Sequence, residues 1–165
     1  MNAMNFLYRI LGHIDDEKYR KVVEFVFLWQ DYNYWYNYKN PDIVNENNGM
    51  PYDRTQALLL AEDNNAVEVY NTVKGKFLRD FKAIPANNKR ADWERDRLLK
   101  TGLYQKEKKY NDQHCSLKDF LDLVYQIRCN FIHGSKEGDD VDIALIGWAR
   151  DSLGELLDKL KYMQE

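Results

Sequence analysis

An arginine and a histidine five positions apart, Arg128 and His133, are the residues of this sequence best suited to phosphate chemistry. They stand in the text IRCNFIHGSK, directly before Gly134. An imidazole can take or give a proton near neutral pH, and a guanidinium keeps its charge and stabilises an anionic transition state. Together they could hold a phosphate and transfer a proton beside it. We therefore take Arg128 and His133 as the candidate residues for phosphate chemistry.

The helix that must position Arg128 makes this arginine unusual. From Ser116 onward, helical periodicity gathers the apolar side chains on one stripe, namely Leu117, Phe120, Leu121, Val124, Ile127 and Phe131. Arg128 falls inside that stripe, where a guanidinium must reach solvent or be held by carboxylates, phosphates or carbonyls. Two interpretations stay open at this point. Either Arg128 serves a ligand phosphate, or it pairs with an acid of a neighbouring helix and His133 is an exposed residue that caps the helix before Gly134.

Arg128 and His133 do not converge on an ideal helix. Five residues correspond to a rotation of about 140°, so the two side chains meet only if the last turn loosens or a second protomer contributes. The C-terminal end of a helix also favours the charged imidazolium, which suits phosphate binding but opposes action as a base. We therefore expect a homodimer whose interface lies close to this helix end.

The text from Leu121 to Lys136, roughly a tenth of the chain, resembles the HEPN superfamily (higher eukaryotes and prokaryotes nucleotide-binding domains). The resemblance rests on the arginine, the four-residue gap, the histidine after two apolar residues, and the glycine that follows. It implies a small bundle of four or five helices and metal-independent endoribonuclease activity on RNA in a dimer, with Arg128 and His133 as the active pair. It also implies that the protein acts in a toxin–antitoxin or phage-defence system and has an antitoxin or a defence protein as partner.

Two positions depart from the usual pattern of that family. Cys129 follows the arginine where a polar residue, often asparagine, is common, and Asn130 comes one position later. Ser135 stands where the toxin branch regulated by nucleotidylation has a tyrosine, so the text is more similar to the abortive-infection-like branches. Besides the ribonuclease, two alternatives stay open. One is a non-catalytic HEPN-like module that binds RNA, a nucleotide or a protein, and the other is a structural helical adaptor.

Basic and acidic residues are segregated along the chain. Eight cations stand against four anions from Lys89 to Lys109, whereas seven anions stand against three cations from Asp139 to Glu165. The basic segment is where we look for phosphate contact, although a solvated face also explains such a run. The candidate RNA-binding residues are Lys106, Lys108 and Lys109 from this segment, together with Asn130 and Lys136.

Composition and length predict one all-α domain over residues 1–165. Eight glycines and three prolines are few for an all-β chain, and 44% apolar residues argue against disorder. The net charge of −3 gives no general attraction to nucleic acid. With no long apolar run and no leader-like start, we expect a cytoplasmic protein without membrane contact. Cys115 and Cys129 lack metal-ligand spacing, so we expect no metal site, no disulfide framework and no cofactor.

Apolar periodicity predicts the main helices of the bundle near residues 16–38, 64–82, 116–133 and 140–162. A short helix near 3–11 and helical text over 54–61 complete the set. Asp15 or Asp16 is expected to cap the first long helix, and Ser116 with Asp119 three residues later resembles a capping box.

The aromatic-rich text between Trp29 and Tyr38 allows two interpretations. Exposed rings at this density could stack nucleic acid bases. Alternatively the rings pack inward and the hydroxyls face outward, as in an amphipathic rim.

Overall fold

The computed structural model describes residues 15–38, 52–84, 102–111, 114–132 and 140–160, and of Tyr38, Tyr52 and Tyr104 the backbone alone. Within these ranges every regular element is helical and none is a strand. The predicted all-α fold class is therefore confirmed. The short helix expected near residues 3–11 lies outside the described residues.

The helices of these ranges follow one another along the chain as α2 (Glu17–Tyr38), α3 (Tyr52–Ala57), the 3-10 helix η1 (Leu59–Glu62), α4 (Asn64–Lys82), α6 (Leu103–Tyr110), α7 (Leu117–Ile132) and α8 (Asp140–Leu160). The four longest, α2, α4, α7 and α8, lie where the periodicity predicts the main helices of the bundle. Helix α6 is an addition to that prediction. This helix has eight residues, and among its described side chains only Leu103 and Tyr110 are buried. Its apolar pattern is therefore too short to recognise in the sequence.

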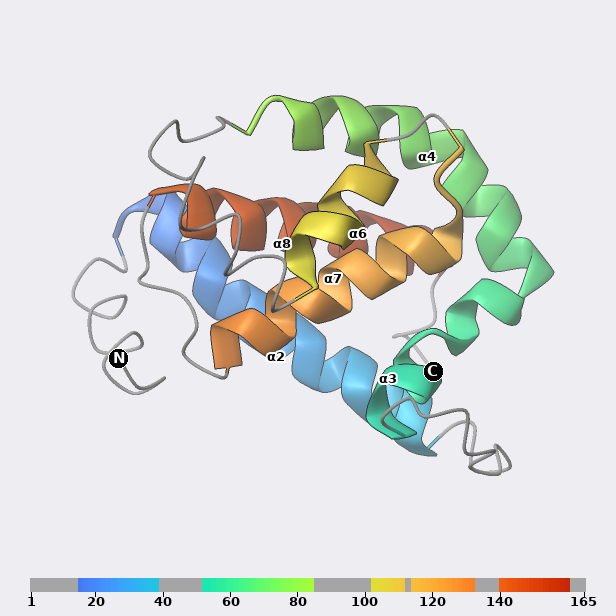
Figure 1. Cartoon of the computed structure of the whole chain (residues 1–165). Coiled ribbons are helices and arrows are strands. Elements are labelled where there is room, and N and C mark those ends of the chain that lie inside the picture. The colour runs from blue at the N-terminus through green and yellow to red at the C-terminus, as the bar shows by residue number, and fades with distance from the viewer. Residues whose placement is uncertain (1–14, 39–51, 85–101, 112–113, 133–139, 161–165) are drawn as a thin grey trace.

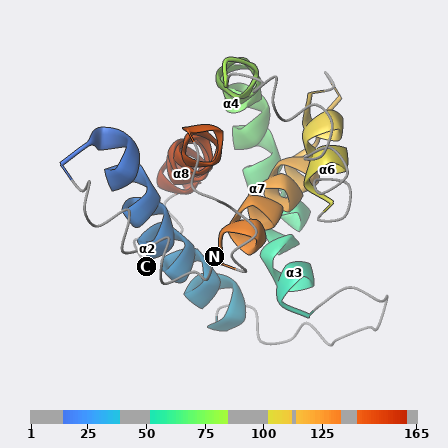
Figure 2. The same cartoon turned by 60° about the vertical axis from the view of Figure 1, so that its left-hand side comes forward.

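Helix α8 lies between α2 and α4, and α7 packs beside them with α6 on its outer side (Figures 1 and 2). This arrangement follows from α8 itself, which buries side chains on most of its circumference and therefore needs neighbours on several sides. Buried apolar residues of all the described helices join in one hydrophobic core. α7 contributes to this core the apolar stripe predicted around Ile127.

Aromatic rings from four helices meet at Phe120 of α7, which is fully buried. Its ring centroid lies 5.4 to 5.9 Å from those of the rings around it, which belong to Tyr70, Phe77, Tyr110 and Trp148. The indole N–H of Trp148 donates to the carbonyl of Phe77 at 3.0 Å, so the polar atom of this large ring is satisfied inside the core. The cluster ties α7 to α4, α6 and α8.

The aromatic residues of α2 mostly pack inward. Trp29, Tyr32 and Tyr36 are buried, whereas Tyr34 is exposed. The hydroxyls do not face outward as the rim interpretation expects. That of Tyr32 donates to the carbonyl of Ala57, and that of Tyr36 donates to Asp53. These bonds fasten the C-terminal half of α2 to α3, which carries both acceptors.

Side-chain caps begin two of the helices as the sequence predicts. The carboxylate of Asp16 accepts from the backbone N–H of Lys18 at 3.0 Å. At α7, the backbone N–H of Asp119 donates to the Ser116 hydroxyl, and the backbone N–H of Ser116 donates to the Asp119 carboxylate. This reciprocal pair is a capping box, which satisfies backbone donors that the first turn of the helix leaves free.

The capping box predicts a pH-dependent contribution to stability. Burial alone would raise the pKa of the Asp119 carboxyl, but bonds from Lys109 and Ser116 outweigh it and lower the pKa below its ordinary value of 3.8. We expect Asp119→Asn to lower the free energy of unfolding by about 1 kcal/mol at pH 7. Since the folded pKa is the lower one, this contribution is complete above the unfolded pKa and is lost as the pH falls through the folded pKa.

Urea denaturation of both proteins at several pH values measures this difference. Asp158→Asn is the matched control, because Asp158 is an exposed aspartate of α8 and surface substitutions typically change stability by less than about 0.5 kcal/mol. A destabilisation by Asp119→Asn that stays constant from neutral pH to about pH 2 would contradict this account of the cap.

Candidate functional site

Aromatic rings hold the guanidinium of Arg128 near the C-terminal end of α7. Its central carbon lies 5.8 Å from the ring centroid of Trp29 on α2 and 5.9 Å from that of Tyr125 on α7. Both distances allow cation–π attraction, which is strongest with tryptophan. Arg128 therefore bridges α2 and α7, two helices that are distant in the sequence, through ring contacts.

No carboxylate among the residues that the structure describes forms an ion pair with Arg128. Its Nη1 donates to the Sγ of Cys129 at 3.9 Å, and sulfur is a weak acceptor. Its Nε is buried and has no acceptor in the described ranges. The side chain as a whole is half-buried. Within this part of the protein, Arg128 keeps an unneutralised positive charge at the surface, and this geometry favours the phosphate interpretation over pairing with an acid.

A cavity of about 390 Å³ opens between α2 and α7 beside Arg128. Most of its wall is apolar, and its lining residues are Phe25, Val26, Trp29, Gln30, Asn33, Arg128, Phe131 and Ile132. The indole N–H of Trp29 is buried and, like the Nε of Arg128, has no acceptor among the described atoms. The cavity is thus mostly apolar, and two of its lining residues carry a buried hydrogen-bond donor without a partner among the described atoms.

Two of the predicted site residues, His133 and Lys136, lie outside the described residues. His133 directly follows Ile132, which ends α7 and lines the cavity. The separation of the two side chains around the helix stays a prediction.

A partly buried hydrogen-bond network centres on Asp53 and includes Tyr125. The hydroxyl of Tyr125 donates to one carboxylate oxygen of Asp53, and the hydroxyl of Tyr36 and the side-chain N–H of Asn33 donate to the other. Burial, with Asp53 adding to it, raises the pKa of both tyrosines, so their hydroxyls stay protonated donors at physiological pH. Because Asp53 fixes the ring of Tyr125, it also fixes one of the two rings that contact Arg128.

Asn130 belongs to a second internal chain of polar contacts and is only 4% exposed. Its side-chain oxygen accepts from the amide of Gln126, whose own oxygen accepts from Arg54. Arg54 also pairs with Asp122 at 3.1 Å. The structure therefore does not place Asn130, a predicted RNA-binding residue, with Arg128 on the wall of the cavity.

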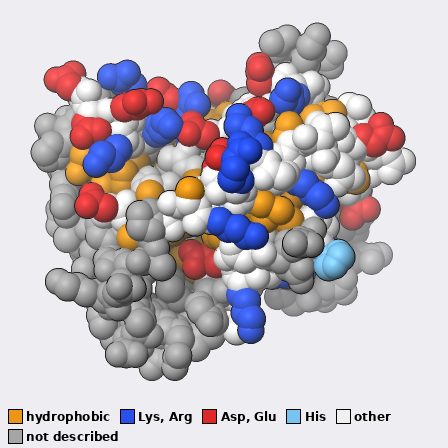
Figure 3. All heavy atoms as spheres, turned by 90° about the horizontal axis from the view of Figure 1, so that it is seen from above, with side chains coloured by type: hydrophobic (Ala, Val, Ile, Leu, Met, Phe, Trp, Pro, Cys, Tyr) orange, Lys and Arg blue, Asp and Glu red, His pale blue; other side chains and the backbone are white. Residues whose placement is uncertain are grey.

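The three candidate lysines lie on α6, on the outer side of α7. Lys106 pairs with Asp122, and Lys109 pairs with Asp119 at 2.5 Å, so α7 neutralises both. Lys108 is exposed and forms no ion pair within the described ranges. On the face shown in Figure 3, basic and acidic side chains are interspersed. Of the three, Lys108 is therefore the lysine whose charge the described residues leave available to a phosphate.

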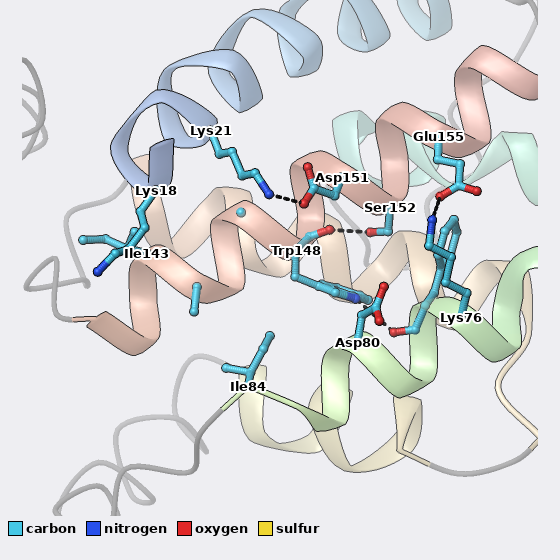
Figure 4. Close-up of a pocket in the computed structure, with 13 residues that line it drawn as sticks. Lys18, Lys21, Lys76, Asp80, Ile84, Ile143, Trp148, Asp151, Ser152 and Glu155 are labelled. Carbon is cyan, nitrogen blue, oxygen red and sulfur yellow. Dashed lines mark hydrogen bonds and ion pairs between the residues drawn. The ribbon is translucent and has the colours of Figure 1, made fainter. Parts of the chain in front are cut away.

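A second cavity, of about 480 Å³, lies between α2, α4 and α8 (Figure 4). Its rim carries two ion pairs, Lys21 with Asp151 at 2.6 Å and Lys76 with Glu155 at 2.7 Å. These pairs neutralise four of the charged groups around the opening, and the indole N–H of the Trp148 wall is already bonded. Lys18 also lines this cavity, but it is exposed, and no lining residue carries a buried donor without a partner. A buried donor without a partner is therefore what distinguishes the cavity beside Arg128.

Sequence reasoning missed the residues that hold Arg128 in place. The sequence placed Trp29 in an aromatic-rich segment with two possible interpretations, and neither Tyr125 nor Asp53 was singled out. One available signal was a tyrosine three positions before the arginine on the same predicted helix, a spacing that places both side chains on one face. The contribution of α2 has no sequence signal, because it depends on tertiary packing.

Comparison of this chain with protein-family models, with curated protein sequences and with solved structures finds no match. In the ranges that the structure describes, no helix is both long enough and apolar enough to cross a membrane. The same ranges contain no group of three or more histidine, cysteine or acidic residues placed to hold a metal ion. The fold and the site together define an all-α bundle with a cationic, aromatic-lined cavity, and its function is inferred from these residues.

Proposed function

We propose that this protein is a metal-independent endoribonuclease of the HEPN type, with Arg128 and His133 as its active pair. The observation that carries the proposal is the charge of Arg128. This charge lies at an open cavity and has no carboxylate partner among the described residues. A half-buried arginine that serves only the fold is expected to have such a partner, because leaving the charge unpaired costs free energy. An anionic substrate supplies the missing partner.

The reaction proposed is an internal transfer at phosphorus. The 2′-oxygen of one nucleotide attacks the adjacent phosphorus, the bond to the 5′-oxygen of the next nucleotide breaks, and the products end in a 2′,3′-cyclic phosphate and a 5′-hydroxyl. The guanidinium of Arg128 stabilises the charge that develops on the phosphate oxygens. His133 transfers protons, one leaving the 2′-hydroxyl and one reaching the 5′-oxygen.

Each chain supplies one histidine in this motif, and two proton transfers suit two histidines, so the proposal includes a homodimer. Phe27, Tyr34 and Ile132 are the large hydrophobic side chains that the described ranges expose. Two of them lie on α2 and the third lines the cavity, which supports an interface on this side of the molecule. Sedimentation at micromolar concentration measures the oligomeric state, and a monomer would remove the second histidine from the mechanism.

One observation favours a second candidate, a HEPN-like module that binds RNA, a nucleotide or a protein without cleaving. The residue after Arg128 is Cys129, and the amide of Asn130 is engaged inside the protein. Neither of the two residues that follow Arg128 therefore offers a free polar side chain to assist catalysis. An antitoxin or a defence protein is the kind of partner that the family resemblance suggests for either candidate.

The proposal is tested with an unstructured RNA in the presence of EDTA. We expect the wild-type protein to cleave it, because the nucleophile is the neighbouring hydroxyl and not a metal-bound water. Mass spectrometry of the fragments should find 2′,3′-cyclic phosphate ends. Fragments with 3′-hydroxyl ends, or activity that disappears with the chelator, would contradict the mechanism. RNA binding without cleavage would support the second candidate, the non-catalytic binding module.

A further inference from the structure

We propose that the cavity beside Arg128 binds one unpaired nucleobase, with the phosphate next to that base on the Arg128 guanidinium. This inference rests on the proposed function and deepens it, because it names the part of the substrate that the site recognises. The ligand chemistry that this site would recognise is a base joined to a phosphate through ribose. A free nucleotide and an unpaired nucleotide of an RNA strand both provide it.

The shape and walls of the cavity suit a flat ring. Its volume of about 390 Å³ lies at the lower end of the range typical for small-molecule sites. Phe25, Trp29 and Phe131 contribute aromatic surface, and Val26 and Ile132 contribute aliphatic surface. Stacking of a base on aromatic side chains is the usual way in which proteins hold unpaired nucleotides.

The two buried donors favour an occupant that carries acceptor atoms. Within the described ranges neither the indole N–H of Trp29 nor the Nε of Arg128 has an acceptor, and Trp29 is only 5% exposed. A buried donor left without a partner is costly, so a purely apolar ligand or side chain would leave that cost in place. A base offers ring nitrogens or carbonyl oxygens on a flat apolar body, and its phosphate offers further acceptors to the guanidinium.

Gln30 is the residue positioned to read the edge of the base. The other amide of the cavity, that of Asn33, is already engaged, since it donates to Tyr36 and Asp53 and accepts from Asn37. Gln30 is exposed at the rim and can both donate and accept. It can therefore adapt to the pattern of one base and discriminate against the others.

The location of the cavity agrees with the proposed chemistry. Its wall ends at Ile132, and His133 is the next residue of the chain. A base held against Trp29 with its phosphate on Arg128 therefore has that phosphate at the end of α7. The cavity would select which phosphodiester bond of a strand reaches the active pair.

The test follows the indole N–H resonance of Trp29 by NMR in a His133→Ala protein, which is expected to bind RNA without cleaving it. The resonance is assigned by its loss in a Trp29→Phe variant. The probes are the four nucleoside 5′-monophosphates and ribose 5-phosphate, which lacks the base. We expect the resonance to shift with at least one nucleotide, and ribose 5-phosphate to bind at least tenfold more weakly. Equal affinity for ribose 5-phosphate, or no shift with any nucleotide, would overturn the proposal.

Matched variants locate the binding. Val26→Trp fills the cavity, whereas Val23→Trp places the same side chain one turn earlier on α2 at a half-buried valine that does not line it. We expect Val26→Trp to weaken nucleotide binding at least tenfold and Val23→Trp to leave it within twofold. Gln30→Ala changes an exposed residue, and we expect it to reduce the differences in affinity among the four nucleotides. Equal affinities in the wild type and in the Val26→Trp and Gln30→Ala variants would place the ligand elsewhere.

A single-stranded tetranucleotide distinguishes the two sources of the ligand. Tighter binding than the monophosphates indicates an RNA strand, and weaker binding indicates a free nucleotide; either result at this cavity supports the inference. Failure of the proposed function has a different signature, since nucleotide binding would persist while the wild type leaves RNA intact in EDTA. Conversely, cleavage that Val26→Trp leaves unchanged would overturn the inference and retain the ribonuclease.

Discussion

Replacement of Arg128 by alanine is expected to slow RNA cleavage by about 100-fold or more, because it removes the charge that stabilises the transition state. The fold is expected to survive. Among the described residues no carboxylate loses its partner, and what the protein loses is two ring contacts, each worth about 0.5 to 2 kcal/mol. Arg128→Lys should restore only a small part of the rate, since an ammonium group cannot reproduce the planar, two-pronged contact of a guanidinium with phosphate.

Arg150→Ala is the matched control for this series. Arg150 is also half-buried, and it pairs with Glu24 and Asp151 on the other side of α2. Its loss affects ion pairs of the fold and leaves the cavity beside Arg128 intact. Initial rates on one unstructured RNA, with circular dichroism to show that each variant is folded, make the comparison. Equal rates for Arg128→Ala and Arg150→Ala would remove Arg128 from the mechanism.

Phe120→Ala is expected to lower the free energy of unfolding by about 3 to 5 kcal/mol. The substitution leaves a cavity where rings from four helices meet, and it removes the contacts of Phe120 with Phe77 and Trp148. Lys118→Ala is the control, because Lys118 is an exposed residue of the same helix and its loss creates no cavity. Urea denaturation measures both, and the midpoint should fall with little change in slope. A loss below about 1 kcal/mol for Phe120→Ala would show that the core collapses around the gap.

The long helices were predictable because their apolar residues repeat with helical spacing over several turns. α7 shows this most directly, since all the predicted stripe residues from Leu117 to Phe131 are buried. Its capping box at Ser116 was equally readable, because it depends only on residues three apart. Helix α6 was not predicted, because its two buried residues, Leu103 and Tyr110, share one face but are too few to establish a periodic pattern. Local rules therefore sufficed for long elements and failed for a short one.

The candidate site was only partly predictable. Arg128 attracted attention because it interrupts an apolar stripe, and this property is visible in the sequence. Its contact with Trp29 was not visible, because it joins residues of α2 and α7 that only tertiary packing brings together. The lysines illustrate the same limit. Their number predicted a basic surface, whereas Lys106 and Lys109 are neutralised by acids of α7 that lie 16 and 10 positions further along the chain.

The most direct measurement compares the wild type with His133→Ala on an unstructured RNA in EDTA, with both proteins shown to be folded by circular dichroism. The account predicts that the wild type cleaves and that the variant is about 100-fold slower or worse, as expected for the loss of a general acid or base. Equal rates for the two proteins would contradict a catalytic role for His133. In that case the cleavage comes from another source, and the protein is better described as a binding module.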